Sequence, residues 1–158
     1  MNSLKKILIC GLNNSGKTTL SQELAKQLKA IHLNADYIRK HLNTDLNFTL
    51  EDRIENARRI GVIADIINSS GQIAIADFIC PVEQCREAFG AYDGNVFTVY
   101  MNTVKAEDNE YKDTGQIFTP PKNFDFEVTS FYNVEKMAED VIRELNYAAI
   151  NDRRTYQI

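Results

Sequence analysis

The chain has 158 residues, which fits one domain with a sizeable core, and we find no internal repeat and no linker-like change of composition. A hydrophobic fraction of 44% and a charged fraction of 25% are typical of soluble globular proteins. The formal net charge of -4 argues against a general binder of nucleic acid or anionic membranes, so any anion site must be local.

The cysteines and the amino terminus indicate the compartment. Cys10, Cys80 and Cys85 are an odd number and have no zinc-like spacing with His32 or His41, which favours reduced thiols in a cytoplasmic protein. The opening stretch, "MNSLKKILIC", has too short an apolar run for a signal peptide, and no later segment is predicted to span a membrane.

Apolar runs and helical spacing alternate along the chain. In chain order, the patterns predict a strand at 6–10, a helix at 17–30, a strand at 31–35, helices at 36–42 and 50–69, a strand at 72–78, a helix at 81–90, strands at 95–102 and 124–129, and a helix at 133–148. Residues 103–124 are predicted to be mostly loop, and the tail "INDRRTYQI" has no usable pattern. This order predicts an α/β fold of three layers, with a parallel sheet of about five strands and helices on both faces.

The stretch "GLNNSGKT", residues 11–18, lies between the first strand and the first helix and matches G-x-x-x-x-G-K-[ST]. Gly11 and Gly16 allow close wrapping of the backbone, whose N–H groups and helix N-terminus attract phosphates. Lys17 adds a charge for the β and γ phosphates, and Thr18 can offer its hydroxyl to Mg²⁺. The predicted nucleotide-binding residues are Gly11, Asn13, Asn14, Ser15, Gly16, Lys17, Thr18 and Thr19.

The helix predicted at 50–69 gathers positive charge in an acidic chain. Thr49 and Asp52 resemble a capping box at its start. At about 100° per residue, Glu51, Glu55 and Arg58 share one face and can neutralise one another, as on any solvated helix surface. The flanking residue 59 is expected to be a surface arginine as well.

Arg53 and Asn56 instead extend the apolar stripe of that helix, so both are expected to point inward. A buried guanidinium without an anion is costly. Either a protein carboxylate neutralises Arg53, or Arg53 faces a cleft that receives an anionic substrate. In open parallel sheets such a cleft lies beyond the carboxyl ends of the strands.

The second predicted strand ends in "NADYIR", which places Asp36 and Arg39 one turn apart at its carboxyl end. A carboxylate there can accept a proton from a substrate hydroxyl or hold a Mg²⁺-bound water. Arg39 can hold a second anion. The alternative is an N-cap aspartate and a surface arginine.

Together these segments resemble the adenylylsulfate (APS) kinase family of P-loop kinases, over residues 4 to about 100. The resemblance rests on "GLNNSGKTTL", on "NADYIRKHL" for the family's Asp-Gly-Asp-x-x-Arg, on "LNFTLEDRIENARRIG" for its Gly-Phe-Ser-x-x-Asp-Arg-x-Glu-Asn-x-Arg-Arg, and on "ADFICP" for its Ala-Ser-Phe-Ile-Ser-Pro. The family transfers the γ-phosphate of ATP to the 3′-hydroxyl of adenylylsulfate.

The resemblance implies an ATP-dependent and Mg²⁺-dependent phosphotransferase in which Lys17 and Asp36 are catalytic. It also implies that Arg39, Arg53 and Asn56 hold the acceptor nucleotide, that two phenylalanines enclose its base, and that a homodimer can form. The two aromatic residues are Phe48 and Phe78. Core packing is the alternative role of each.

The chain departs from the family pattern at two residues. The first Asp of Asp-Gly-Asp is Asn34, and the Ser of Ala-Ser-Phe is Asp77, which places a negative charge beside the predicted acceptor site. Because Asp77 ends a buried strand, it is a candidate partner of Mg²⁺ as well as of the substrate.

The lid region, residues 103–124, departs further. It lacks the family's Arg-Asp and Lys-Gly-Leu-Tyr segments, contains no arginine and is acidic, so it is poorly suited to clamp phosphates. Phe118, with the Pro120–Pro121 pair, is either a wall of the ATP base site or a buried aromatic in a surface loop.

We therefore expect one P-loop kinase domain over residues 1–158 that phosphorylates a small anionic nucleotide, with adenylylsulfate as the first candidate. The first alternative is a related kinase with another acceptor, such as a cytidine diphosphoramidate kinase or gluconate kinase. The second alternative is a nucleotide-binding module without turnover, which the acidic lid and Asp77 motivate.

Overall fold

The computed structural model describes residues 6–91 and 94–155. Residues 1–5 of the opening stretch and residues 156–158 of the tail therefore lie outside the described part. Its strands are β1 (Lys6–Gly11), β2 (Ile31–Asn34), β3 (Ala74–Phe78), β4 (Val96–Met101) and β5 (Phe126–Val128). Its helices are α1 (Lys17–Leu28), α2 (Ala35–His41), α3 (Leu50–Ser69), α4 (Glu83–Gly90), the 3-10 turn η1 (Ala106–Asp108), α5 (Lys112–Ile117) and α6 (Val134–Thr155).

The five strands form one parallel sheet in the order β2-β3-β1-β4-β5, as the alternation of strands and helices predicts. β1 lies at the centre, between β3 and β4. The loops that follow β1, β2, β3 and β4 therefore all leave from the same edge of the sheet. This is the edge where ligands bind in open parallel sheets.

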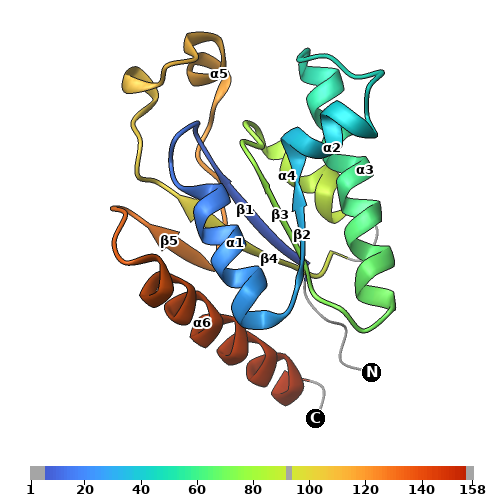
Figure 1. Cartoon of the computed structure of the whole chain (residues 1–158), viewed down its shortest axis with the longest axis vertical. Helices are drawn as coiled ribbons and strands as arrows, with labels where there is room; N and C mark the ends of the chain where they lie inside the picture. The colour runs from blue at the N-terminus through green and yellow to red at the C-terminus, as the bar shows by residue number, and fades with distance from the viewer. Residues whose placement is uncertain (1–5, 92–93, 156–158) are drawn as a thin grey trace.

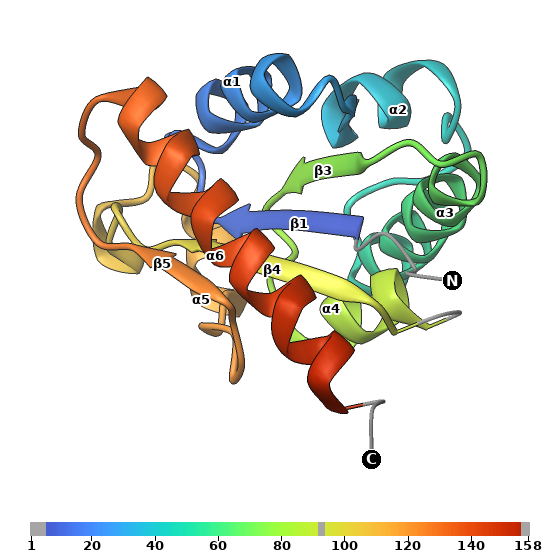
Figure 2. The same ribbon diagram turned by 90° about the horizontal axis from the view of Figure 1, so that it is seen from below.

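Helices cover both faces of the sheet and complete three layers (Figures 1 and 2). β1 alternates between the two cores, because Ile7 and Ile9 pack toward α1 and α6, whereas Leu8 and Cys10 pack toward α3 and α4. α3 and α4 approach closely, since a Cβ added at Gly61 would lie 2.2 Å from the carbonyl oxygen of Phe89.

The structure differs from the sequence prediction in the lid region. Residues 103–124, predicted as mostly loop, contain η1 and α5 (Figure 1). Thr114 and Gly115 are buried, and a Cβ at Gly115 would lie 2.8 Å from the carbonyl oxygen of Ala106. These short turns depend on close backbone contacts rather than on an apolar stripe, so hydrophobic periodicity did not predict them.

The last helix is longer than predicted. α6 continues to residue 155 instead of ending near 148, and its residues Leu145 and Ala148 pack against the core that contains Ile7 and Ile9. Among residues 6–91 and 94–155, no helix is long and apolar enough to cross a membrane.

Candidate active site

The loop between β1 and α1 has the backbone that its glycines predict. Gly16 has φ 94° and Asn14 has φ 60°, both in the left-handed region. A Cβ on Gly16 would lie 2.4 Å from a ring carbon of Phe131, so the loop also has no room for a side chain at this position. The loop is therefore wrapped tightly at the N-terminus of α1.

The N-terminus of α1 and Lys17 provide positive charge. Gly16 precedes the helix and supplies no side-chain cap, which leaves the first N–H groups of α1 available to an anion. The ammonium of Lys17 donates to the carbonyl oxygen of Leu12 at 2.6 Å. Burial lowers the pKa of Lys17, and the charges of Asp77 and Asp36 oppose that shift.

One cavity of about 430 Å³ joins this loop to the ends of β2 and β3. Its walls include residues 13–14 and 16–19 of the loop, together with Asn34, Asp36, Asp77, Phe78 and Ile79. The structure thus brings the predicted nucleotide-binding residues to the same cavity as the predicted catalytic carboxylate. Gly11 and Ser15 shape the loop without lining this cavity.

Asp77 forms the floor of the cavity at the end of β3. The hydroxyl of Thr18 donates to Oδ2 of Asp77 at 2.7 Å, and Nε2 of His32 lies 2.8 Å from Oδ1. Asn34 donates its amide to both carboxylate oxygens at 3.3 Å. The carboxylate therefore lies against the hydroxyl that the sequence assigns to Mg²⁺.

The residues of this corner fit a magnesium ion. Mg²⁺ is usually bound by one or two protein oxygens together with substrate phosphates rather than by a cage of protein ligands. Within the described part of the chain, no three His, Cys, Asp or Glu side chains form such a cage. Thr18 and Asp77 supply neighbouring hard oxygens beside the phosphate-binding loop, which is the donor set that P-loop enzymes use.

Asp36 lies in the first turn of α2, exposed on the wall of the cavity. The N-cap of α2 is Asn34, whose side chain accepts from the N–H of Tyr37 at 2.9 Å. The alternative role of Asp36 as the helix cap is therefore wrong. Asp36 is thus left as a residue that lines the cavity without capping the helix.

Two arginines, Arg39 of α2 and Arg53 of α3, lie around one phenylalanine just before α3. Phe48 is 66% exposed, and the guanidinium carbons of Arg39 and Arg53 lie 4.7 and 5.5 Å from its ring centroid. Arg39 donates to the carbonyl oxygen of Asn47, and Arg53 donates to that of Phe48 at 3.0 Å. Within the described chain, no carboxylate forms an ion pair with either arginine.

Neither guanidinium is therefore neutralised by a direct ion pair among the described residues. Burial lowers the pKa of Arg39, and the nearby charge of Arg53 lowers it further. The charges of Asp36 and Asp52 lie near Arg39 and oppose this shift of its pKa. Burial also lowers the pKa of Arg53. The expectation that Arg53 points inward is only partly met, because its side chain is half-buried and lies across Phe48 instead of entering the core.

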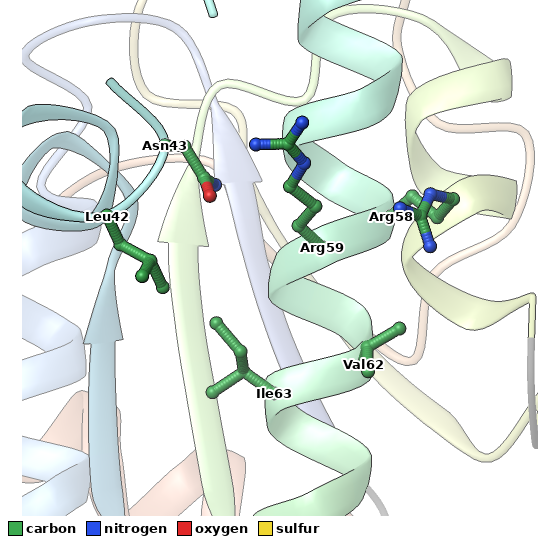
Figure 3. Close-up of a pocket in the computed structure, with 6 residues that line it drawn as sticks. All are labelled: Leu42, Asn43, Arg58, Arg59, Val62 and Ile63. Atoms are coloured by element: carbon green, nitrogen blue, oxygen red, sulfur yellow. The ribbon is translucent and has the colours of Figure 1, made fainter. Parts of the chain in front are cut away.

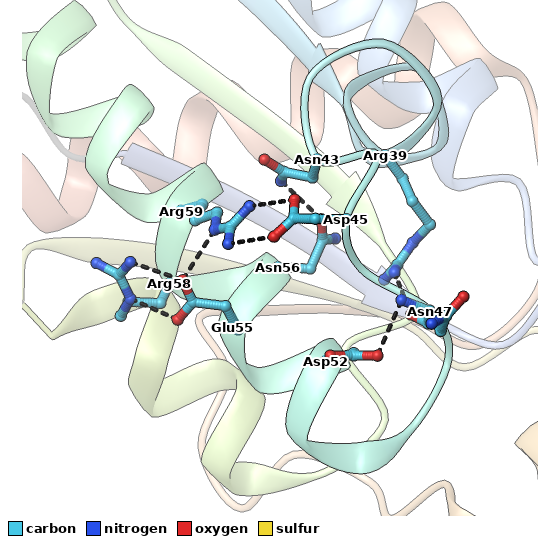
Figure 4. A network of polar contacts seen from close by, with 9 residues as sticks. All are labelled: Arg39, Asn43, Asp45, Asn47, Asp52, Glu55, Asn56, Arg58 and Arg59. Atoms are coloured by element: carbon cyan, nitrogen blue, oxygen red, sulfur yellow. Dashed lines mark hydrogen bonds and ion pairs between the residues drawn. The ribbon is translucent and has the colours of Figure 1, made fainter.

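Asn56 is buried, with 2% of its surface exposed, as the helical stripe predicts. Its carbonyl oxygen accepts from the amide of Asn43 at 2.9 Å, and Asn43 is equally buried (Figure 4). Because Asn43 already uses one lone pair of this carbonyl oxygen, the Nδ2 donor is the group of Asn56 that takes no part in this contact and can bind a ligand.

The outer face of α3 is a neutralised network, as its sequence predicts for Glu55 and Arg58, whereas Glu51 is exposed and is not part of it. Arg58 and Arg59 both donate to Glu55 at 2.7–2.8 Å, and Arg59 also pairs with Asp45 at 2.7 Å (Figure 4). Thr49 caps the helix by accepting from the N–H of Asp52. In contrast to a capping box, the carboxylate of Asp52 accepts from the N–H of residue 47.

A second cavity, of about 350 Å³, lies between the end of α2 and α3 (Figure 3). Its lining residues are Leu42, Asn43, Arg58, Arg59, Val62 and Ile63. Both arginines already contact carboxylates, so this cavity has no unpaired charge to attract an anion. It lies away from the phosphate-binding loop.

The lid region contacts the phosphate-binding loop directly. The hydroxyl of Thr103 donates to the carbonyl oxygen of Ser15 at 2.8 Å, and the amide of Asn14 lies 3.5 Å from a carboxylate oxygen of Glu110. Phe118 instead packs against Tyr100 and Arg86, at ring-centroid distances of 6.3 and 5.8 Å. This favours the interpretation of Phe118 as a partly buried aromatic of the loop.

Three contacts of the site were missed by sequence reasoning: His32 on Asp77, Asn43 on Asn56, and Phe131 over Gly16. One signal was available, because residues 32 and 34 of a strand point to the same side. Asn43 and Phe131 lie in loops whose sequence has no comparable periodicity.

Comparisons with known proteins agree on one family. The model of the adenylylsulphate kinase family matches residues 4–140. The adenylyl-sulfate kinase of Halothermothrix orenii is 34% identical over 158 residues, which cover 85% of each chain. That of Staphylococcus epidermidis is 30% identical over 164 residues, which cover 88% of this chain and 82% of the other.

A solved structure extends the likeness to three dimensions. The APS kinase CysC of Mycobacterium tuberculosis, in complex with AMPPNP and APS, superposes with a TM-score of 0.76 at 26% identity, covering 91% of this chain and 98% of that one. The phosphate-binding loop, the match over residues 4–140 and the shared fold together show that the chain belongs to the adenylylsulphate kinase family.

Proposed function

We propose that this protein transfers the γ-phosphate of ATP to the 3′-hydroxyl of adenylylsulfate. The observation that carries the proposal is the pair of guanidiniums, Arg39 and Arg53, that form no ion pair among the described residues and lie around the exposed ring of Phe48. An aromatic face flanked by two cations suits a base with its phosphate and sulfate groups. The relatives named adenylyl-sulfate kinase support the same substrate.

The donor side consists of residues 11–19. The loop amides and Lys17 bind the phosphates of ATP and stabilise the charge that develops on the transferring phosphoryl group. Thr18 would hold Mg²⁺, which supplies further positive charge at these phosphates. Binding of phosphate would draw the Lys17 ammonium away from the Leu12 carbonyl that it contacts in this structure.

The acceptor side consists of Asp36, Arg39, Phe48, Arg53, Asn56 and Phe78. Asp36 accepts the proton of the ribose hydroxyl as its oxygen attacks the γ-phosphorus and the bond to the ADP oxygen breaks. Arg39 and Arg53 hold the anionic groups, Nδ2 of Asn56 donates to the acceptor, and Phe48 and Phe78 enclose its base. Asp36 lines the donor cavity, so it can face both substrates.

The remaining features belong to the same proposal. The chain forms one kinase domain, with residues 103–124 as a lid that is anchored on the loop by Thr103. It acts in the cytoplasm with a small-molecule nucleotide and needs neither nucleic acid nor membrane. A homodimer is proposed by analogy with the family, and light scattering of the purified protein would measure its mass.

The test is ADP release from Mg²⁺–ATP with and without adenylylsulfate. We expect release that depends on adenylylsulfate, with the new phosphate on the 3′-oxygen by ³¹P NMR. If ADP is released with another anionic nucleotide but not with adenylylsulfate, the proposed substrate is wrong and the proposed type of reaction still holds. Binding of ATP without turnover of any acceptor would refute the enzyme.

The lid gives a reason to test other acceptors as well. Glu110 lies 3.5 Å from Asn14 and residues 103–124 contain no arginine, so the clamp of the family pattern is changed. A related kinase with another acceptor, such as cytidine diphosphoramidate or a sugar acid, fits a changed lid. Both should therefore be included in the screen of acceptors beside adenylylsulfate.

A further inference from the structure

We propose that Asp77 is the carboxylate that positions the metal of the bound nucleotide. The family pattern has a carboxylate at residue 34, on the neighbouring strand, and in this chain Asp77 takes its place. This inference rests on the proposed binding of Mg²⁺–ATP. It concerns two positions at which the chain departs from the family, where Asn34 stands for Asp and Asp77 stands for Ser.

The two departures lie side by side. β2 and β3 are neighbouring parallel strands, and residue 34 is the Cα partner of residue 77 in their register. Adjacent strands lie about 4.8 Å apart, and the amide of Asn34 reaches both oxygens of Asp77 at 3.3 Å. If the aspartate stands at residue 77 instead of residue 34, the negative charge moves from β2 to the neighbouring β3 and stays in the same cavity.

The carboxylate of Asp77 is placed for a metal rather than for the acceptor. Its Oδ2 accepts from the hydroxyl of Thr18 at 2.7 Å, which turns the lone pairs of that hydroxyl toward the cavity. Acceptor residues Arg39 and Arg53 are instead grouped around Phe48 at the start of α3. P-loop enzymes hold Mg²⁺ between the loop hydroxyl and an aspartate at a neighbouring strand end.

The charge of Asp77 also requires a cation. Its side chain is only 1% exposed, and its ion-pair partner among the described residues is His32, which carries a positive charge only when protonated. The hydrogen bonds from Thr18 and Asn34 are neutral, and a buried carboxylate with neutral partners is unfavourable unless a positive charge is close. The charge of Lys17 meets this need in part, and a divalent ion would meet it fully.

His32 is the positioning residue of this arrangement. Its Nε2 lies 2.8 Å from Oδ1 of Asp77, and it projects from the same side of β2 as Asn34. With His32 on Oδ1 and Thr18 on Oδ2, the plane of the carboxylate is fixed before metal arrives. Contacts of this kind to metal-binding groups typically change metal affinity by about 10- to 100-fold.

The experiment measures nucleotide binding without turnover. Calorimetry measures the affinity for AMPPNP in Mg²⁺ and in EDTA, and the affinity in Mg²⁺ divided by that in EDTA is the ratio to compare among variants. In Asp77→Ser this ratio should be at least about tenfold lower than in wild type. The exchange variant Asn34→Asp/Asp77→Ser should restore most of the wild-type ratio. His32→Leu should lower the ratio, whereas His32→Gln, which keeps a donor, should recover it.

Asp77→Asn, which keeps the shape and removes the charge, should behave as Asp77→Ser, and thermal melting identifies any variant that fails to fold. A wild-type ratio in Asp77→Asn would overturn the role of Asp77, and a ratio in the exchange variant no better than in Asp77→Ser would overturn the exchange. Neither result involves an acceptor, so the failure of adenylylsulfate as a substrate remains a separate outcome.

Discussion

Asp36 and Lys17 come from different elements but line one cavity, where Lys17 is proposed to act on ATP and Asp36 on the acceptor. Asp36→Asn keeps the size and hydrogen bonding of the side chain but removes the proton acceptor. We expect kcat to fall by about 10²- to 10⁴-fold, with the affinity for ATP changed little. Steady-state kinetics with varied acceptor would measure both, and an unchanged kcat would exclude Asp36 as the general base.

The buried thiol of Cys10 predicts a loss of stability at alkaline pH. Burial raises its pKa from the ordinary value of 9.0 to about 11. Because the unfolded chain releases this proton at lower pH than the folded chain, the stabilisation is complete below about pH 9 and is lost as pH rises toward about 11.

Urea unfolding of wild type and Cys10→Ala at pH 8, 9 and 10 would check this sign. The free energy of unfolding should fall with pH more steeply in wild type than in the variant, by up to about 1.4 kcal/mol per pH unit. Equal slopes would mean that Cys10 contributes nothing. Absolute stabilities of the two proteins differ because of the smaller side chain, so the slopes are the quantity to compare.

The sequence predicted residues of this site wherever a motif or a helical period fixed their position. The phosphate-binding loop and the burial of Asn56 follow from such rules, and so does the neutral pairing of Glu55 with the arginines that follow it. Contacts between elements, such as His32 with Asp77, depend on strand order and register, which the sequence alone did not supply.

At the scale of elements, the close contact of α3 and α4 fixes the helix that carries Arg53 and Asn56. A Cβ at Gly61 would lie 2.2 Å from the carbonyl oxygen of Phe89 and 2.9 Å from its carbonyl carbon. Gly61→Ala should therefore destabilise the protein by about 1–3 kcal/mol, although alanine is the better helix former by about 1 kcal/mol.

Ile66→Ala is the matched control, because Ile66 is exposed on the same helix. It should change the free energy of unfolding by less than about 0.5 kcal/mol. Urea denaturation would give both values. A Gly61→Ala protein as stable as wild type would show that α3 and α4 can separate without loss of packing.

The acidic lid is the second element with a measurable effect. Glu110 lies 3.5 Å from the amide of Asn14, next to the site proposed for phosphates. Glu110→Gln should strengthen ATP binding by about two- to fivefold at low salt, and the gain should shrink as salt screens the charge. Glu144→Gln, on α6, serves as the control; equal affinities in both variants would show that the lid charge does not reach the nucleotide.

The helices and strands show which patterns predict structure. The long stripe of α3 and the buried runs of β1 and β3 were found because many residues obey one period. α5 was missed because its six residues, KDTGQI, have no apolar face and its packing depends on Gly115 against Ala106. Short helices stabilised by tertiary contact lie beyond local patterns.

For the whole molecule, alternation of strands and helices predicted the parallel sheet and its two covered faces, because parallel strands need crossover connections. The order β2-β3-β1-β4-β5 could not be predicted from that alternation alone. It is this order that places residue 77 between β1 and β2, so that one cavity contains groups from three strand ends.

The central claim is that donor and acceptor bind at separate sites over one edge of this sheet. Calorimetry of ATP and of adenylylsulfate with Lys17→Ala and Arg53→Ala tests it most directly. Lys17→Ala should lose ATP binding and keep that of adenylylsulfate, whereas Arg53→Ala should weaken adenylylsulfate by about 10- to 100-fold and leave ATP unchanged. Equal loss of both ligands in a folded Arg53→Ala protein, or no loss of either, would contradict two separate sites.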